Sequence, residues 1–79
     1  MSDLDARLSS LFLAAFPSLE AGTVRAATQD STAGWDSVAT VTLTSLVEEE
    51  FGETFDLDEA ADWTSYQTVR LSLEKRLGG

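Results

Sequence analysis

Apolar residues recur every three or four positions in separate stretches of this 79-residue chain, and this spacing constrains the fold more than any other feature. In the first stretch the spaced residues are Leu4, Leu8, Leu11, Phe12 and Ala15. A stripe with this period is typical of an α-helix that buries one face. No stretch shows a convincing strand alternation, so the sequence predicts an all-α fold.

The first helix is expected over about residues 3–16. Ser2 is its candidate N-cap, and Pro17 ends it because proline disfavours helical geometry in the preceding residue. Residues 17–36 then lack a clear period and predict a long loop. A loop of this length is unusual in a small domain unless it serves a function. One short packed turn is expected within it, formed by Val24, Ala26 and Ala27.

The second helix is expected over residues 37–51, with Asp36 as its N-cap and Gly52 at its end. A short third helix fits within residues 55–63, where acidic and apolar residues alternate irregularly.

The last helix is expected to begin at Thr64, because Thr64 and Gln67 match a capping box, and to end before Gly78. The chain is therefore predicted to be one domain, residues 1–79, folded as a small four-helix bundle with a long loop between the first two helices and a short third helix. Its predicted core consists of Leu4, Leu8, Leu11, Phe12, Leu43, Val47, Phe51, Tyr66, Val69 and Leu73.

The composition excludes several classes of protein. The chain has 14 acidic and 5 basic residues, a net charge of −9, and no cysteine or histidine. It therefore cannot form a disulfide, a thiolate or imidazole metal site, or a Ser-His-Asp triad. Nucleic acid and anionic membrane surfaces are disfavoured as partners because both are negatively charged. With no signal peptide and no run long enough to span a membrane, we expect a cytoplasmic protein that does not insert into membranes.

The negative charge is concentrated in the middle of the chain. Residues 36–62 contain nine acids, and no lysine or arginine occurs between Arg25 and Arg70. The second and third helices are therefore expected to form one uncompensated negative surface. Such a surface either keeps a small protein in solution or docks basic partners, and the charge pattern does not choose between these roles.

Ser37 is the strongest candidate for a residue that carries a chemical group. It is expected at the start of the second helix, after Gly34-Trp35-Asp36. A phosphate ester on its hydroxyl would lie at the positive end of the helix dipole, and Gly34 would leave room for a bulky group. Serine is also an ordinary residue at a helix start, so this position alone does not establish a site.

The surroundings of Ser37 resemble the acyl carrier protein family over essentially the whole chain. The features that carry the resemblance are Asp36-Ser37-Val38, Glu48-Glu49-Glu50-Phe51 eleven residues on, the short acidic helix, and Thr64-Ser65-Tyr66 opening the last helix. The family usually has leucine where this chain has Val38. The resemblance implies that the long loop before Ser37 is a family feature.

The resemblance implies a carrier that is not an enzyme. A phosphopantetheinyl transferase would attach a 4′-phosphopantetheine arm from coenzyme A to Ser37, with Asp36 and Gly34 beside it. The thiol of the arm would hold acyl intermediates of fatty acid, polyketide or specialised lipid synthesis. The cargo would lie near Leu46, Phe55 and Trp63, and no metal site is expected.

The partners implied by the resemblance are acyl-transferring or acyl-modifying enzymes with basic docking patches, which would meet a monomeric carrier. Their expected docking residues are Val38, Val41, Glu48, Glu49, Asp56, Asp58 and Glu59. Many fatty-acid carriers have further acids where this chain has Ala39, Thr40, Thr42 and Thr44, which suggests a specialised carrier.

The sequence is also compatible with other functions. The cargo could be an aminoacyl or peptidyl group, or the chain could be an acidic helical interaction module without a prosthetic group. A calcium loop at Asp56 is rejected because Ala60 and Ala61 stand where a ligand and a glycine are needed. A Gly78-Gly79 end is shared with ubiquitin-like modifiers, but their fold needs strands that this sequence does not predict. The two tryptophans, Trp35 and Trp63, could anchor a partner, but in a domain this small they are expected to pack in the core or under loops.

Overall fold

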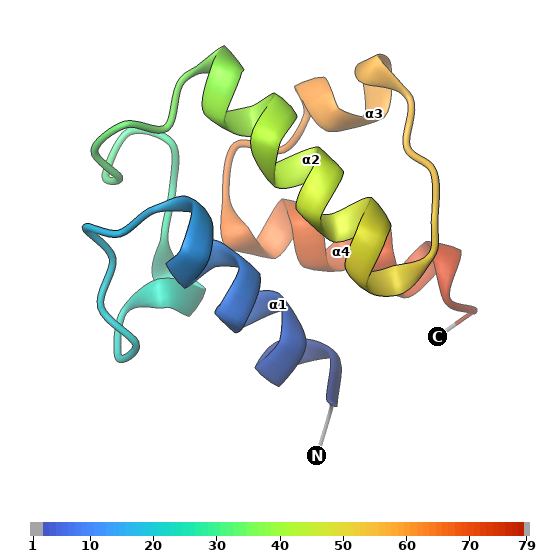
Figure 1. Cartoon of the computed structure of the whole chain (residues 1–79), viewed down its shortest axis with the longest axis horizontal. Helices are drawn as coiled ribbons and strands as arrows, with labels where there is room; N and C mark the ends of the chain where they lie inside the picture. Colours follow the sequence, from blue (N-terminus) through green and yellow to red (C-terminus); the bar gives the residue numbers. More distant parts are fainter. Residues whose placement is uncertain (1–2, 79) are drawn as a thin grey trace.

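Four helices and one 3-10 turn follow the apolar periods of the sequence in a computed structural model that describes residues 3–78 (Figure 1). They are α1 (Asp3–Ala15), η1 (Val24–Ala26), α2 (Ser37–Phe51), α3 (Leu57–Ala61) and α4 (Tyr66–Arg76). The prediction of an all-α domain with a long α1–α2 loop and a short third helix is confirmed. Ser2, the expected N-cap of α1, and Gly79 lie outside the described residues.

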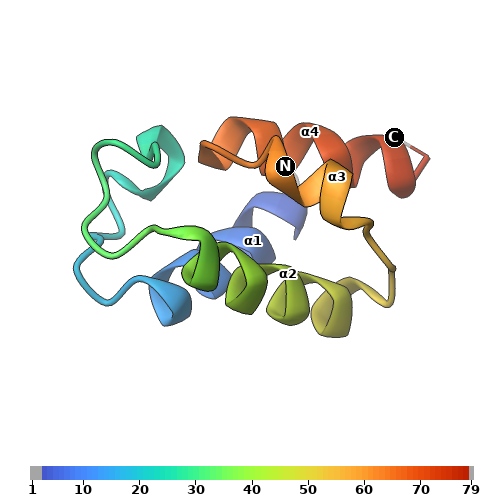
Figure 2. The same cartoon turned by 90° about the horizontal axis from the view of Figure 1, so that it is seen from above.

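The helices pack around one hydrophobic core. α1 contacts both α2 and α4, and α3 packs against α2. α1 and α2 lie side by side and run in opposite directions (Figure 1). Viewed from above, the long loop lies at one end of the molecule (Figure 2). Within residues 3–78, no helix combines the length and the apolar character that crossing a membrane requires.

The core contains most of the residues predicted for it. The predicted residues that are fully enclosed are Leu8, Phe12, Leu43, Val47, Tyr66, Val69 and Leu73. Three others, Leu4, Leu11 and Phe51, are partly buried and pack against this cluster. The buried residues that the helical period did not select are Phe16, Val24, Ala27, Trp35, Phe55, Ala60 and Trp63. Most of these lie in loops, where no periodicity marks the buried side.

The long loop is held in place by an aromatic cluster made of Phe12, Phe16, Trp35 and Tyr66. The Trp35 ring lies 5.0 Å from that of Phe16 and 5.6 Å from that of Phe12, between ring centroids. Phe12 also meets Tyr66 edge-on at 5.1 Å. Each buried aromatic removes roughly 150–250 Å² from water, so the cluster fastens both ends of the loop to the helices.

Backbone hydrogen bonds also join the loop to the start of α4, and they correct the predicted cap. The N–H of Gln29 donates to the carbonyl of Thr64 at 2.8 Å, and the N–H of Tyr66 donates to that of Ala27 at 3.0 Å. This pairing holds Thr64 in the connection before the helix. Ser65 is therefore the N-cap, and its capping box is completed by Thr68, so the prediction of Thr64 with Gln67 is wrong.

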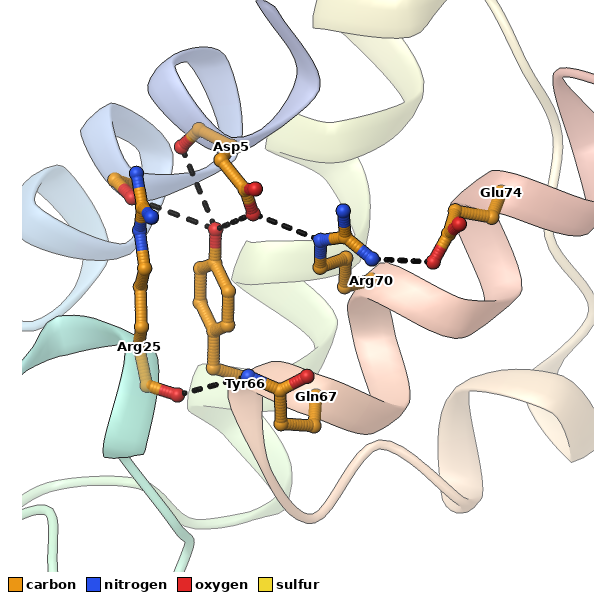
Figure 3. Close-up of polar contacts among 7 residues, drawn as sticks. Asp5, Arg25, Tyr66, Gln67, Arg70 and Glu74 are labelled. Carbon is orange, nitrogen blue, oxygen red and sulfur yellow. Dashed lines mark hydrogen bonds and ion pairs between the residues drawn. The ribbon is translucent and has the colours of Figure 1, made fainter. Parts of the chain in front are cut away.

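A polar cluster of Asp5, Tyr66 and Arg70 fixes α1 against α4 (Figure 3). One carboxylate oxygen of Asp5 accepts hydrogen bonds from the Tyr66 hydroxyl and from Nε of Arg70, each at 2.8 Å. Arg70 also pairs with Glu74 one turn further along α4. The cluster satisfies the polar end of Tyr66, whose ring belongs to the core.

The same contacts shift two pKa values in opposite directions. The hydrogen bond from Arg70, supported by that from Tyr66, lowers the pKa of Asp5 below its usual value. Burial, together with the hydrogen bond to Asp5, raises the pKa of Tyr66. A carboxyl whose pKa is lower in the folded state stabilises the fold above its unfolded pKa, which is about 4. That contribution disappears as the pH falls through the folded pKa.

We therefore predict that Asp5→Asn lowers the free energy of unfolding at pH 7 by roughly 1–3 kcal/mol, because a charged hydrogen-bond acceptor is lost. The difference between the variant and the parent chain should shrink as the pH is lowered from about 5 to about 2. Urea unfolding at several pH values measures both effects. Asp3→Asn, at an exposed residue of the same helix, is the control and should change the free energy of unfolding little. A loss of stability in Asp5→Asn that does not depend on pH would contradict the role assigned to the Asp5 carboxylate.

A serine at the start of α2 beside a cavity

The start of α2 is positioned by Trp35, which lies two residues before Ser37. The indole is buried in the aromatic cluster, and its Nε1 donates to the Thr40 hydroxyl at 3.0 Å. Gly34 precedes it with a φ of +84°, a left-handed conformation that other residues rarely adopt. A Cβ there would have no heavy atom within 4 Å, so the positive φ rather than lack of space favours glycine at this position.

Asp36 caps α2 as predicted, and Ser37 is the first residue of the helix. The Asp36 carboxylate accepts from the N–H of Ala39 at 2.8 Å. Ser37 is exposed, and among the described residues the N–H groups of Ser37 and Val38 have no acceptor. The first turn thus presents a free hydroxyl and two free amide donors at the positive end of the helix dipole.

Ser37 also lies at a cavity of about 490 Å³ between α2 and α3. Cavities of this size are typical of small-molecule sites, which span roughly 300–1,000 Å³. The lining comes from one face of α2, from α3 and its flanks, and from one residue of the long loop: Gln29, Ser37, Thr40, Val41, Thr44, Ser45, Glu48, Phe55, Leu57, Ala60, Ala61 and Trp63.

Two of the three residues predicted for a cargo pocket line this cavity. Phe55 and Trp63 pack edge-on at 5.1 Å between ring centroids, and the Trp63 indole donates to Ser72 at 3.0 Å. Leu46 does not line it, because at about 100° per residue its side lies opposite that of Ser37 on α2. Sequence reasoning also missed the lining residues Thr40, Thr44 and Ser45, although they share the helical face of Ser37 at spacings of three, seven and eight.

Exposed apolar residues lie on α2 and α3, the two helices that border the cavity. Val38 is 72% exposed, Val41 is 56% exposed, and Leu57 on α3 is 80% exposed. The first two were predicted as docking residues, and Leu57 was not. Single exposed apolar side chains are ordinary, but Val41 and Leu57 line the same cavity and Val38 follows Ser37 directly, so this group marks a candidate contact surface. Ala39 and Thr40, by contrast, are only partly exposed, so they contribute little to it.

The acidic surface is less uniform than predicted, because two arginines from other helices reach it. Arg7 donates from Nε to the Glu50 carboxylate at 2.9 Å and lies over the Phe51 ring. Arg76 pairs with Glu59 at 2.6 Å and with Glu53 at 3.9 Å. The prediction of one uncompensated surface is therefore wrong, since the fold brings basic residues from both ends of the chain to the acids.

Glu48 differs from the other acids because it supports the cavity. Its Oε2 accepts from the N–H of Phe55 at 2.8 Å, which ties α2 to the segment before α3. On the far side of that segment, Arg76 donates to the Thr54 carbonyl and lies over the Phe55 ring. The exposed acids that have no ion pair among residues 3–78 and lie on α2 or at the start of α3 are Glu49, Asp56 and Asp58.

Residues 3–78 contain no group of three or more acids, cysteines or histidines placed to hold a metal ion. Comparison with models of protein families, with curated proteins and with solved structures found no match. The geometry around Ser37 is therefore the basis for any functional conclusion.

We predict that Glu48→Ala lowers the free energy of unfolding by about 1–3 kcal/mol, because the partly shielded N–H of Phe55 loses its acceptor. Glu48→Gln retains a carbonyl oxygen and should lose less. Glu49→Ala, one residue away on the exposed side, should stay within about 0.5 kcal/mol of the parent chain. Chemical denaturation of the three variants measures this order, and equal losses at Glu48 and Glu49 would contradict it.

Proposed function

We propose that this protein is a phosphopantetheine-dependent acyl carrier, loaded on Ser37 and without catalytic activity of its own. The observation that supports it best is the position of Ser37. Ser37 is exposed at the start of α2 and lines the cavity. The sequence around it resembles the acyl carrier protein family, and the chain has neither cysteine nor histidine to act as a nucleophile or base.

The residues around Ser37 fit the phosphate of such an arm. The free N–H groups of Ser37 and Val38 would donate to its oxygens, and the helix dipole would stabilise its charge. Asp36 keeps the helix start rigid through its cap, and Trp35 fixes the loop before it. When bound, the arm supplies a terminal thiol that holds acyl groups as thioesters.

The cavity beside Ser37 would shelter part of the cargo, with Phe55 and Trp63 at its apolar side. The partners would be a phosphopantetheinyl transferase and enzymes that transfer or modify acyl groups. Val38, Val41 and Leu57 offer them an apolar contact. On the same two helices or at their start, Glu49, Asp56 and Asp58 have no ion pair among residues 3–78, and their charges would attract basic patches and raise association rates.

We predict that purified protein gains the mass of one phosphopantetheine arm when incubated with coenzyme A, Mg²⁺ and a permissive phosphopantetheinyl transferase. Intact-mass spectrometry measures the gain. Ser37→Ala should abolish it, because the acceptor hydroxyl is gone. Ser45→Ala should not change it, although Ser45 is an exposed serine at the same cavity. No gain in the folded parent chain would overturn the proposed function.

A second prediction concerns the charges around the docking face. Glu49→Gln combined with Asp58→Asn should slow association with the transferase several-fold at low ionic strength, and the difference should vanish at high salt. The control makes the same charge change at two exposed acids elsewhere, Asp3→Asn with Glu20→Gln. Stopped-flow association rates measure the effect, and an equal slowing in both double variants would show that only net charge matters.

A further inference from the structure

The two sides of the cavity differ in chemistry. Five of the six α2 residues that line it are polar: Ser37, Thr40, Thr44, Ser45 and Glu48. Val41 is the sixth. Phe55, Leu57, Ala60, Ala61 and Trp63 form an apolar side, and Gln29 of the long loop is the one remaining lining residue and is polar. A site for a plain alkyl chain needs no such polar side, because each polar group shielded by methylene groups loses its hydrogen bonds to water.

The hydrogen bonds already made by the polar side determine what it can still offer. The Thr40 hydroxyl accepts from Trp35 at 3.0 Å and donates to the Asp36 carbonyl at 3.1 Å, so its proton is used. Thr44 donates its proton to the Thr40 carbonyl at 2.7 Å and keeps free lone pairs. Glu48 uses Oε2 for the N–H of Phe55, and its Oε1 has no partner among residues 3–78.

The hydroxyls of Ser37 and Ser45 and the amide of Gln29, which also line the cavity, can donate or accept, whereas Thr44 and Glu48 offer acceptors only. Threonine hydroxyls and carboxylates accept hydrogen bonds through their lone pairs, and an ionised carboxylate can do nothing else. A ligand that satisfies them must carry a hydrogen-bond donor on the edge that faces α2. Its other edge must be apolar, to pack against Phe55 and Trp63.

Building on the proposed function, we propose that the cargo is an acyl group with a hydrogen-bond donor on its chain, such as a hydroxyl, rather than a plain saturated chain. The donor would bond to the Glu48 carboxylate or to the Thr44 hydroxyl, and the hydrocarbon edge would contact the apolar side. A cargo that ends in a carboxylate would be disfavoured, because Glu48 carries the same charge.

The absence of cysteine allows this to be tested without any prosthetic group. Ser37→Cys places the single thiol of the chain at the cavity. We would expose it to two competing disulfide probes of equal length, one with a methyl end and one with a hydroxyl end. Both probes are neutral, so the net charge of the protein does not bias the result. Mass spectrometry at exchange equilibrium gives the ratio of the two adducts.

We expect the Ser37→Cys variant to favour the hydroxyl probe by roughly three- to tenfold, the range that one net hydrogen bond supplies. The reference is Glu20→Cys, at an exposed loop position that does not line the cavity, where the ratio should be near one. Adding Glu48→Gln or the isosteric Thr44→Val to Ser37→Cys should reduce its preference. Adding Glu49→Gln, outside the cavity, should leave the preference unchanged.

The outcomes separate this proposal from the function on which it rests. Three results would overturn the cargo assignment: equal ratios in the Ser37→Cys and Glu20→Cys variants, a preference for the methyl probe, or a preference that survives both Glu48→Gln and Thr44→Val. None of these results depends on a transferase. Failure of the transferase to modify Ser37 would instead overturn the carrier function and leave the preference of the cavity as measured.

Discussion

The burial of Trp35 is the interaction on which the rest of the structure depends. Its ring packs against Phe12 in α1 and against Phe16 just after α1. Its indole N–H donates a hydrogen bond to Thr40 in the first turn of α2. One side chain thus anchors the long loop, links α1 to α2 and sets where α2 begins. Because Ser37 follows Trp35 by two residues, it emerges exposed on the first turn, beside the cavity.

Two arginines reduce the repulsion among the acidic side chains of this chain. Arg7 and Arg76 come from α1 and α4, and each joins an ion pair with a cation–π contact at the acidic segment. Exposed ion pairs stabilise a protein by only about 0–1 kcal/mol each, so these pairs offset part of the repulsion between the acids rather than adding much stability. Among residues 3–78, Glu49, Asp56 and Asp58 are exposed acids without an ion pair on α2 or at the start of α3, the two helices that carry Val38, Val41 and Leu57.

The cavity has an apolar side and a polar side within a few turns of helix. Phe55 is held from α2 by Glu48 and from α4 by Arg76, so the apolar side is fixed by polar contacts at its edges. On α2, threonine protons are used within the helix itself, which leaves acceptors toward the cavity. The polar residues of α2 therefore determine which hydrogen-bonding groups this side of the cavity presents.

The sequence by itself determined the helices, because the apolar period, Asp36 and Gly52 are local signals. It also singled out Ser37, whose motif is local too. The tertiary structure decided the rest. The burial of Phe16 follows no period, since loop burial depends on distant partners; for Val24 and Trp35 the sequence predicted packing but not the residues they pack against. The cap at Ser65 depends on pairing between residues 27–29 and 64–66. Likewise, only folding could bring Arg7 and Arg76 to the acids, because residues far apart in sequence attract one another only once the helices between them have packed.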